Sequence, residues 1–381
     1  MKKICFSCPT LLLRRPIAEI IPYLKRCKVS LFTPRDLIRG FLKIHYNKFK
    51  NVKILKYSII NPPFLSSEWP IPVSPIFIIR MLKLLKKNDI IHMWVPFYIG
   101  NSLLAILKKL FFPSKKLYLT MDTFPGISFR MGKIKDILFR LYYNTLGKIV
   151  FSAADKIILY GTSMIKFAFQ AGILKNKIKI IPSGVNVKVK SKEKDIKKEF
   201  KIKKEDLIVL FVGLINERKG VDIFIKTAYK LKNQNIIFFI VGDGPKRKDY
   251  EKLVEKYGLK DKVIFTGFRK DIHNFYNEAD LFFLPSRGEG LAGVIMESFV
   301  HEVPVVSSDI AGTRDLIKNN ENGFLCKSEN ISCFSKKIEI LLKDKSLRKK
   351  FIDKSKEIIE TRYNWKVIIE KILRLYSNPT N

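Results

Sequence analysis

The sequence predicts an α/β protein with two doubly wound parallel sheets, and three observations lead to this prediction. Its 381 residues are too many for one ordinary core and fit two domains of about 150–200 residues each. Short, mostly apolar runs recur along the chain without polar alternation, which is typical of strands buried on both faces of a parallel sheet. Segments with helical spacing separate these runs, as in consecutive βα units.

The C-terminal half shows this alternation most clearly. Its first predicted strand, residues 207–213, precedes a predicted helix over residues 221–232. The remaining predicted strands are residues 236–242, 262–267, 281–285, 303–307 and 323–326, with a helix over residues 246–257. Residues 364–376 carry apolar side chains at i, i+3 and i+4, so they predict an amphipathic helix at the end of the chain.

The N-terminal half repeats the pattern less clearly. Its predicted strands are residues 3–8, 52–57, 90–94, 116–120 and 156–160. The charge-rich residues 187–204 are interpreted as a surface segment between domains. We therefore expect an N-terminal domain over residues 1–182, a C-terminal domain over residues 183–362, and a final helix, residues 363–381, that packs back on the N-terminal domain.

Charge is distributed unevenly along the chain. The net charge is +37, and residues 1–190 hold 34 Lys and Arg against 7 Asp and Glu, a net of +27. This imbalance predicts an anionic partner for the first half, which could be a lipid surface, a lipid phosphate or a nucleic acid. A basic surface that only keeps the protein in solution is the alternative.

The cysteines and the apolar runs bear on location. Cys5, Cys8, Cys27, Cys326 and Cys333 favour a reducing compartment without disulfides. Cys5 and Cys8 have redox or zinc spacing, but no second Cys or His pair accompanies them, so we interpret both as buried or strand-end thiols. No apolar run reaches the roughly 18 residues that span a bilayer, so we expect a cytoplasmic protein.

The most informative stretch lies between the predicted strands 281–285 and 303–307. Glycines 288, 290 and 293 permit a turn, and the following apolar residues predict a helix. The start of such a helix offers free N–H groups to a phosphate. Glu289 and Glu297, eight positions apart, suit hydroxyl groups on either side of that phosphate. Phosphate flanked by sugars describes a nucleotide-sugar.

Motifs in order along the chain resemble a known family. Residues 211–225, 241–245, 263–268, 279–286, 289–297 and 303–314 together resemble the family-four retaining glycosyltransferases of the GT-B fold. The resemblance implies two Rossmann-like domains facing a cleft, the first binding the acceptor and the second the donor. It also implies retaining transfer of a hexosyl or related sugar from a nucleotide-sugar, with no metal and no further cofactor.

The resemblance also implies roles for individual residues. Glu297 would bind the ribose hydroxyls, Glu289 would face the donor sugar, and Lys219 would stabilise the leaving diphosphate. Leu214 stands where the family usually has Arg, so we expect Arg218 to supply that charge. The other implied donor-binding residues are Gly213, Phe268, Gly290, Leu291, Ala292, Gly293 and Val294. Ala292 replaces a common glycine, which requires a negative φ at this position.

Two residues of the N-terminal half are candidate sugar or acceptor contacts. Asp122 lies near the position where the family often has a histidine after a strand. His92 lies near the end of a predicted strand, where a structural histidine is an equally good interpretation. The glycine-rich first loop of the family is replaced by the apolar and basic residues 8–15.

Apolar and basic segments of the N-terminal half suggest the kind of acceptor. They are residues 11–15, 24–28, 103–112 and 134–143. Their composition favours a lipid-linked or cell-surface glycan acceptor and salt-sensitive association with the anionic inner face of the membrane. Alternatives are an epimerase or phosphorylase of the same fold, an impaired transferase that only binds sugar-nucleotide, and a basic nucleic-acid-binding protein. No recognised nucleic-acid-binding motif accompanies the charge, so no nucleic-acid partner is expected.

Overall fold

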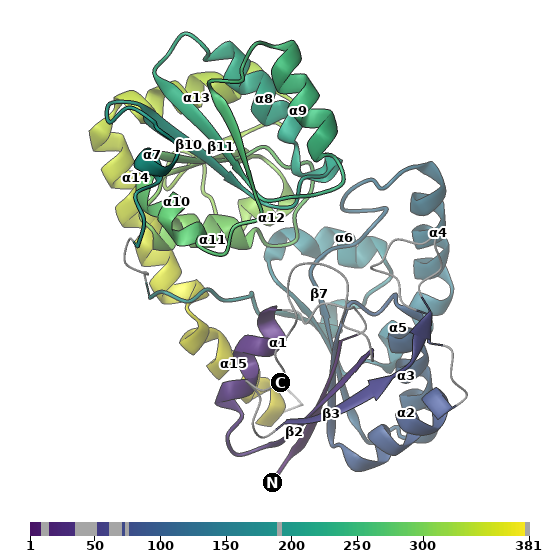
Figure 1. Cartoon of the computed structure of the whole chain (residues 1–381). Helices are drawn as coiled ribbons and strands as arrows, with labels where there is room; N and C mark the ends of the chain where they lie inside the picture. The colour runs from purple at the N-terminus through teal and green to yellow at the C-terminus, as the bar shows by residue number, and fades with distance from the viewer. Residues whose placement is uncertain (9–14, 35–51, 61–70, 73–75, 189–192, 378–381) are drawn as a thin grey trace. The chain divides into compact units, whose positions relative to one another are not determined.

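A computed structural model describes residues 1–8, 15–34, 52–60, 71–72, 76–188 and 193–377. The chain divides into two compact units (Figure 1). The first consists of Met1–Pro182 with Ile368–Asn381, and the second is Ser183–Val367. Each unit contains one parallel sheet between layers of helices, which confirms the predicted α/β fold class.

The first unit contains a seven-stranded sheet of order β3-β2-β1-β6-β7-β8-β9. Its strands are β1 (Lys3–Ser7), β2 (Lys28–Pro34), β3 (Val52–Tyr57), β6 (Ile90–Trp94), β7 (Lys116–Met121), β8 (Lys156–Leu159) and β9 (Ile178–Ile180). Every pairing in this sheet is parallel. A separate antiparallel pair joins β4 (Ile59–Ile60) and β5 (Ile71–Pro72).

Helices cover both faces of the first sheet (Figure 1). One layer contains α2 (Ile76–Lys87), α3 (Ile99–Phe111), α4 (Lys133–Asn144) and α5 (Leu146–Ala153), in which α2 contacts α3, α3 contacts α5 and α5 contacts α4. The other helices of this unit are α1 (Arg15–Ile20) and α6 (Ile165–Gln170). The last helix, α15 (Trp365–Ser377), begins in the second unit and continues into the first.

Helix α15 is fixed to the first unit by polar contacts near its end. The Lys2 ammonium donates a hydrogen bond to the carbonyl of Tyr376 (2.6 Å). The hydroxyl of Tyr118 on β7 donates to the carbonyl of Leu375 (3.1 Å). Tyr376 itself is 3% exposed and its ring lies against Tyr118 on β7, so the last turn of α15 is part of the core of this unit.

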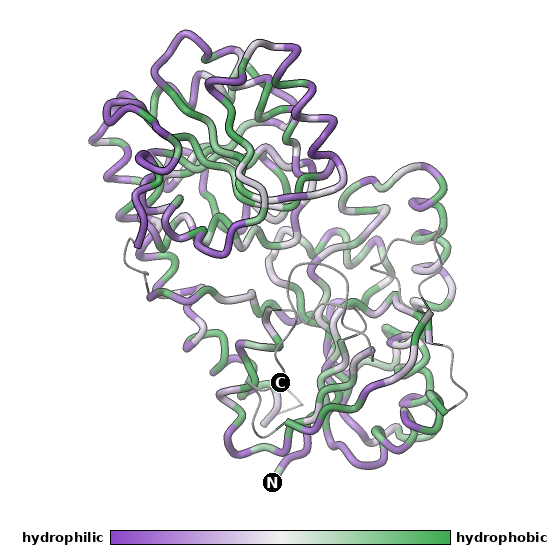
Figure 2. The backbone as a smooth tube through the Cα atoms, in the orientation of Figure 1, coloured by the Kyte–Doolittle hydropathy of each residue, from purple (hydrophilic) through white to green (hydrophobic). Residues whose placement is uncertain are grey.

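The second unit contains a six-stranded parallel sheet of order β12-β11-β10-β13-β14-β15. Its strands are β10 (Leu207–Val212), β11 (Ile236–Val241), β12 (Val263–Gly267), β13 (Leu281–Leu284), β14 (Val305–Ser308) and β15 (Phe324–Cys326). The strands are the most hydrophobic segments of the unit (Figure 2), and β11 and β13 are buried along their whole length. This burial on both faces explains why the strands lack polar alternation.

Two helical layers enclose the second sheet (Figure 1). Helices α8 (Val221–Lys230), α9 (Arg247–Lys256) and α13 (Ile331–Lys343) form one layer. The others are α7 (Ile196–Glu199), α10 (Ile272–Glu278), α11 (Gly293–Val300), α12 (Ala311–Arg314) and α14 (Lys345–Ile358). Within the described part of the chain, no helix is both long and apolar enough to cross a bilayer.

Two features of the strands and cysteines differ from the sequence-based expectations. Strand β2 was not predicted, because Ser30 and Thr33 interrupt its apolar run; both are buried, and the Ser30 hydroxyl donates to the Asn88 side-chain carbonyl (3.2 Å). The prediction of no disulfide is wrong, since Cys326 at the end of β15 is bonded to Cys333 in the first turn of α13. Cys5 and Cys8 are buried thiols, as predicted.

The segment interpreted as a surface linker is instead docked on the second unit over its described part. Ile196 is fully buried in the core of that unit. The side-chain oxygen of Asn274 accepts a hydrogen bond from the amide of Glu193 (2.9 Å), and the Glu278 carboxylate accepts one from the amide of Ile196 (2.6 Å). The high charge of the segment concealed this docking, because apolar residues that reach the core, including Ile196, Phe200 and Ile202, are spaced among charged residues.

Candidate functional site

The candidate site lies at the carboxyl edge of the second sheet, where β10 and β13 are neighbours. The strand order reverses there: β11 and β12 lie beyond β10, whereas β14 and β15 lie beyond β13. Loops that leave two such strands diverge, and ligands of doubly wound sheets bind in the crevice between them. The two loops here are residues 213–220 and residues 285–292.

A buried carboxylate joins these two loops. Oε1 of Glu289 lies 2.7 Å from Nζ of Lys219, and Oε2 lies 3.4 Å from Nη1 of Arg218. The Ser286 hydroxyl donates a third contact, 2.7 Å to Oε1. The Glu289 side chain is only 7% exposed, so its charge is balanced almost entirely by protein groups. The structure thus brings together the three residues predicted to be catalytic.

The charge state of Glu289 follows from these contacts. Burial by itself would raise the pKa of the carboxyl group. The positive charges of Lys219 and Arg218, with the hydrogen bonds from Lys219 and Ser286, outweigh burial and hold the pKa below its usual value. Glu289 is therefore ionised at neutral pH and keeps both cations at the carboxyl edge of the sheet.

Arg287 fixes the relative position of the two loops. Its guanidinium makes paired contacts with the carboxylate of Asp222 in the first turn of α8, at 2.8 and 2.7 Å. It also contacts the carboxylate of Glu329 at 2.7 and 3.1 Å. Its amide donates to the carbonyl of Arg218 (2.7 Å). Paired arginine contacts of this kind fix geometry as well as charge, so the loop that carries Glu289 is held against the loop that carries Lys219.

Glycines allow the backbones around the site to approach closely. A Cβ on Gly220, which has φ of +68°, would lie 2.1 Å from the carbonyl oxygen of Pro285. A Cβ on Gly312 would lie 2.4 Å from the carbonyl oxygen of Gly290. No other residue fits at either position without a shift of the backbone. Gly312 in α12 therefore supports the Glu289 loop from the side of β14.

Helix α11 begins directly after this loop. Its N-terminal boundary residue, Ala292, has φ of −74°, so the negative φ required by alanine at this position is confirmed. No side chain caps this helix end. The first N–H groups of a helix lack partners within the helix and carry a partial positive charge. Together with Lys219 and Arg218, they form a positively polarised surface suited to a phosphate.

The other predicted donor-binding residues lie at the same edge of the sheet. Gly213 follows β10, and Phe268 follows β12 with 42% of its surface exposed. Glu297 lies one turn into α11 and is partly buried. Leu214, which occupies the usual arginine position, is 46% exposed. The structure therefore places Gly213 and Glu297 on the loop and helix next to Glu289 and Phe268 on the loop after β12, two strands from β10, while their roles stay predictions.

The two candidates in the first unit differ in accessibility. Asp122 directly follows β7 and is partly exposed. His92 is 1% exposed, and its two ring nitrogens share hydrogen bonds with hydroxyl groups: Nδ1 lies 2.5 Å from the Tyr376 hydroxyl and Nε2 2.7 Å from the Thr120 hydroxyl. Burial lowers the pKa of His92 to about 3. These contacts favour the structural interpretation of His92 over a sugar contact, because neither ring nitrogen is left for a substrate.

Sequence reasoning missed the residues that support the site. Ser286 lies within a recognised motif, so its position next to the loop was visible although its contact with Glu289 was not. Asp222 and Arg287 are 65 residues apart, and Gly312 lies on another element. No local spacing signals such contacts, since only the neighbouring positions of β10, β13 and β14 bring them together.

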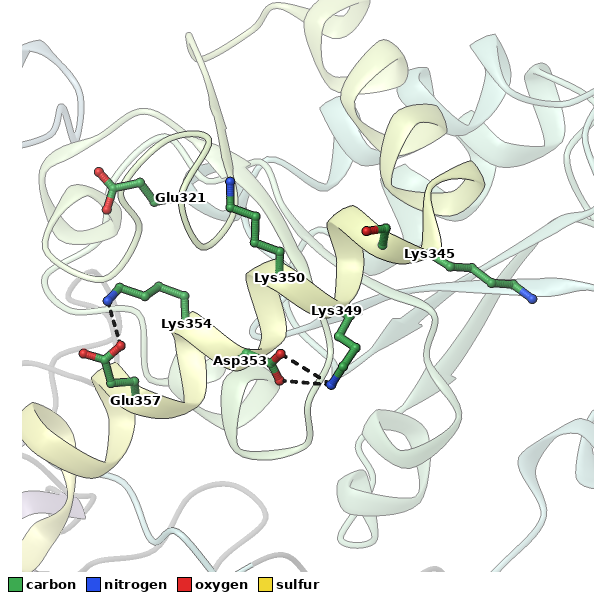
Figure 3. Close-up of a pocket in the computed structure, with 8 residues that line it drawn as sticks. Glu321, Lys345, Lys349, Lys350, Asp353, Lys354 and Glu357 are labelled. Carbon is green, nitrogen blue, oxygen red and sulfur yellow. Dashed lines mark hydrogen bonds and ion pairs between the residues drawn. The ribbon is translucent and has the colours of Figure 1, made fainter.

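A second concave region lies away from this edge. A surface hollow of about 890 Å³ runs along α14 and is lined by lysines and acids (Figure 3). Lys349 pairs with Asp353 (3.4 Å), and Lys354 pairs with Glu357 (2.6 Å). The hollow is an open surface lined by four lysines and three acids, and we assign it no role in the site.

Known proteins that resemble this chain include glycosyltransferases, in agreement with a phosphate-binding site at this edge of the sheet. Residues 192–358 match the family model for glycosyl transferases group 1. An uncharacterized 41.2 kDa protein in the cps region of Klebsiella pneumoniae is 30% identical over 277 residues, which are 71% of this chain and 73% of that protein.

Two further proteins give context for the chain and for its fold. The N,N'-diacetylbacillosaminyl-diphospho-undecaprenol alpha-1,3-N-acetylgalactosaminyltransferase of Campylobacter jejuni is 30% identical over 249 residues, covering 63% of this chain and 64% of that protein. The crystal structure of Anabaena Alr3699/HepE in complex with UDP and glucose superposes with a TM-score of 0.80 at 18% identity, covering 99% of this chain and all of that one. At this identity the likeness establishes the fold.

Proposed function

Since the chain belongs to the group 1 glycosyltransferases of the GT-B fold, we propose that it transfers a sugar with retention of configuration to a lipid-linked acceptor. That the protein is a glycosyltransferase with a nucleotide-sugar donor follows from the family itself. Retention, independence from metal ions, and the nature of the acceptor are the proposed parts.

The single observation that carries the proposal is the contact of Lys219 and Arg218 with Glu289 beside the start of α11. When the bond between the sugar and the diphosphate breaks, negative charge grows on the diphosphate. Cations and helix N–H groups that are already fixed in place stabilise such charge without reorganisation. The second unit therefore has what is needed to promote departure of a nucleoside diphosphate.

Retention requires the new bond to form on the face that the diphosphate leaves. In the proposed step, the acceptor oxygen forms a bond to the anomeric carbon as the bond from that carbon to the diphosphate oxygen breaks. The proton of the acceptor hydroxyl moves to the departing diphosphate. Glu289 is held by two cations in the described structure, so we assign it to orientation of Lys219 and contact with the sugar, and not to covalent attack.

Independence from metal ions is proposed because two side-chain cations already lie at the carboxyl edge of the sheet. A divalent ion serves the same purpose in many other phosphate-transfer sites. The proposal predicts that a chelator leaves the rate of transfer unchanged, measured as nucleotide release with and without it. Loss of activity on chelation, restored by a divalent ion, would contradict this part.

A lipid-linked acceptor is proposed on two grounds. The Campylobacter jejuni relative is named for an undecaprenol-linked substrate. The first half of this chain also has a net charge of +27, which suits an anionic membrane surface. We propose that the enzyme acts at the inner face of the membrane as a peripheral protein.

The experiment that tests the proposal is nucleotide release from a panel of UDP-, GDP- and ADP-sugars in the presence of a membrane-lipid extract. Release from one donor, with labelled sugar entering the lipid fraction and loss of release in Glu297→Ala, would support it. Binding of a nucleoside diphosphate without release from any donor would instead favour an impaired transferase. That alternative is motivated by Leu214, which leaves the usual arginine position uncharged.

A further inference from the structure

Helix α4 of the first unit exposes a stripe of large apolar side chains. Ile134, Ile137, Leu138 and Leu141 are 76%, 64%, 58% and 58% exposed, respectively. Their spacing of i, i+3, i+4 and i+7 places them on one face of the helix. Single exposed apolar residues are ordinary, but a continuous exposed stripe marks an interaction surface.

The opposite face of α4 anchors the helix to its own unit. Phe139 and Tyr143 are buried, at 7% and 1% exposure. The Tyr143 hydroxyl donates to the carbonyl of Pro125 (3.2 Å), and the Tyr142 hydroxyl donates to the carbonyl of Pro96 (3.2 Å). Because these contacts fix the helix, the exposed stripe cannot turn inward without breaking them.

The apolar surface extends beyond α4. Leu146 and Ile149 on the neighbouring helix α5 are 37% and 45% exposed, and Met131 just before α4 is 36% exposed. Helices α4 and α5 contact each other directly. We call the seven residues the α4 stripe: Met131, Ile134, Ile137, Leu138, Leu141, Leu146 and Ile149.

The surroundings of the α4 stripe are strongly basic. Lys133 and Arg140 lie on one flank of α4 and Lys135 on the other, and all three are exposed. Arg130 and Lys148 extend this charge at the two ends of the segment. The single acid between residues 123 and 154 is Asp136, whose carboxylate accepts a hydrogen bond from the amide of Met131 (2.8 Å). The charge around the stripe is therefore positive.

Helix α14 in the second unit shows that lysine content alone does not make such a surface. Two of its lysines, Lys349 and Lys354, pair with Asp353 and Glu357 (Figure 3), and its other basic residues leave the helix with a net positive charge. Its apolar residues, such as Phe351 and Ile358, face the core. Helix α4 combines unbalanced positive charge with outward apolar side chains, and that combination is what an anionic lipid interface attracts.

We propose that the α4 stripe docks the enzyme on an anionic bilayer, with its Ile and Leu side chains entering the interface and its Lys and Arg side chains contacting headgroup phosphates. A second copy of the chain is a poorer occupant, because pairing two such surfaces would bring their basic flanks together. A helix of 12 residues lies in the plane of the interface, being too short to cross.

This inference deepens the proposed function and rests on it, since a lipid-linked acceptor is the reason for the enzyme to reach a membrane. The test uses the full chain and co-flotation with two kinds of vesicle, phosphatidylcholine alone and phosphatidylcholine mixed with phosphatidylglycerol. Wild-type protein is expected to bind the mixed vesicles, and to bind them less as salt increases. Equal binding to both kinds of vesicle would overturn the role of charge.

Two double variants and one control test the stripe directly. Ile137→Gln with Leu138→Gln should weaken vesicle binding by roughly tenfold or more, because two apolar side chains no longer enter the interface. Lys133→Gln with Lys135→Gln should weaken binding to the mixed vesicles by about tenfold or more. Leu174→Gln is the matched control, since Leu174 is 64% exposed in the same unit but lies outside the stripe. Unchanged binding of the stripe variant would refute the proposal.

Nucleotide release in the absence of vesicles separates this inference from the proposed function. The stripe variants should keep the basal release rate, because their side chains are exposed on the first unit and the donor residues lie on the second. Turnover without vesicle binding would refute the docking role of the α4 stripe and leave the proposed transferase activity unaffected. Vesicle binding through the α4 stripe without turnover would refute the proposed transferase activity and leave the α4 stripe as a membrane-docking surface. Association of copies that the stripe variant abolishes would assign the surface to self-association.

Discussion

Replacing Glu289 by glutamine removes one negative charge from the centre of the site without changing the size of the side chain. In the wild-type protein the carboxylate contacts Lys219 at 2.7 Å, Arg218 at 3.4 Å and the Ser286 hydroxyl at 2.7 Å. The amide oxygen of glutamine can still accept one of these contacts. The two cations, however, lose the charge that balances them.

The structure sets the size of the expected effect. Removing one partner of a fully buried ion pair costs about 3–5 kcal/mol. Lys219 is 12% and Arg218 32% exposed, so water can replace part of the lost interaction. We therefore expect the second unit to lose about 2–3 kcal/mol of its free energy of unfolding. For a unit of this size the loss corresponds to about 5–10 °C in Tm.

The assay is denaturant unfolding of wild type and Glu289→Gln at pH 7 and at lower pH. The pKa of Glu289 is lowered by folding, so its contribution is fully present above the ordinary carboxyl pKa of 4.5 and is lost as pH falls through the folded value. The difference between the two proteins should therefore shrink below about pH 4.5. A nucleoside diphosphate should stabilise the variant more than wild type, because it supplies the missing negative charge.

Glu217→Gln is the matched control for this prediction. Its carboxylate is 77% exposed and contacts Lys246 at 3.3 Å, although it lies on the same loop as Lys219. An exposed pair of this kind contributes less than about 1 kcal/mol. The reasoning fails if Glu289→Gln is as stable as Glu217→Gln at pH 7, or if its loss of stability does not depend on pH.

Three further predictions concern the support of the site and the first unit. Gly312→Ala should destabilise the second unit by about 1–3 kcal/mol and weaken donor binding, because the added Cβ would lie 2.4 Å from the Gly290 carbonyl oxygen. Gly293→Ala is the control in the unfolding measurements, because no atom lies within 4 Å of its added Cβ. Arg287→Gln should slow turnover more than it weakens donor binding, because it loosens the loop that holds Lys219; steady-state kinetics that show unchanged kcat would contradict this. The pKa of His92 is lowered from 6.5 to about 3, so the first unit should lose about 2 kcal/mol of its free energy of unfolding between pH 7 and pH 5. Unfolding curves of His92→Gln should not show this loss. An equal loss in wild type and variant would contradict the prediction.

The sequence predicted the fold class because burial on both faces of a parallel sheet leaves a local signal. Strands β10, β11 and β13 appear as uninterrupted apolar runs, and their positions were predicted closely. Strand β2 left no such signal, since Ser30 and Thr33 are buried through hydrogen bonds that depend on neighbouring elements. The disulfide between Cys326 and Cys333 depends on how β15 meets α13, which spacing alone does not reveal.

The sequence indicated which residues belong to the candidate site, but not how they contact one another. Glu289, Lys219 and Arg218 were each identified from motifs, but the direct contacts of Glu289 with Lys219 and Arg218 span 70 and 71 residues. The paired contacts of Arg287 with Asp222 and the close approach of Gly312 to Gly290 likewise could not be predicted without the strand order of the sheet. His92 was predicted with two interpretations, and its contact with Tyr376, 284 residues away, decides between them.

The central claim is that Lys219 stabilises the departing diphosphate, and the most direct measurement is the rate of nucleotide release by Lys219→Met with the identified donor. Lys246→Met is the control, because Lys246 is 40% exposed in the same unit and pairs with the exposed acids Glu217 and Asp249. The account predicts a fall in kcat of about 10²–10³ for Lys219→Met, with little change for the control. Equal rates in the two variants, with both proteins folded, would contradict it.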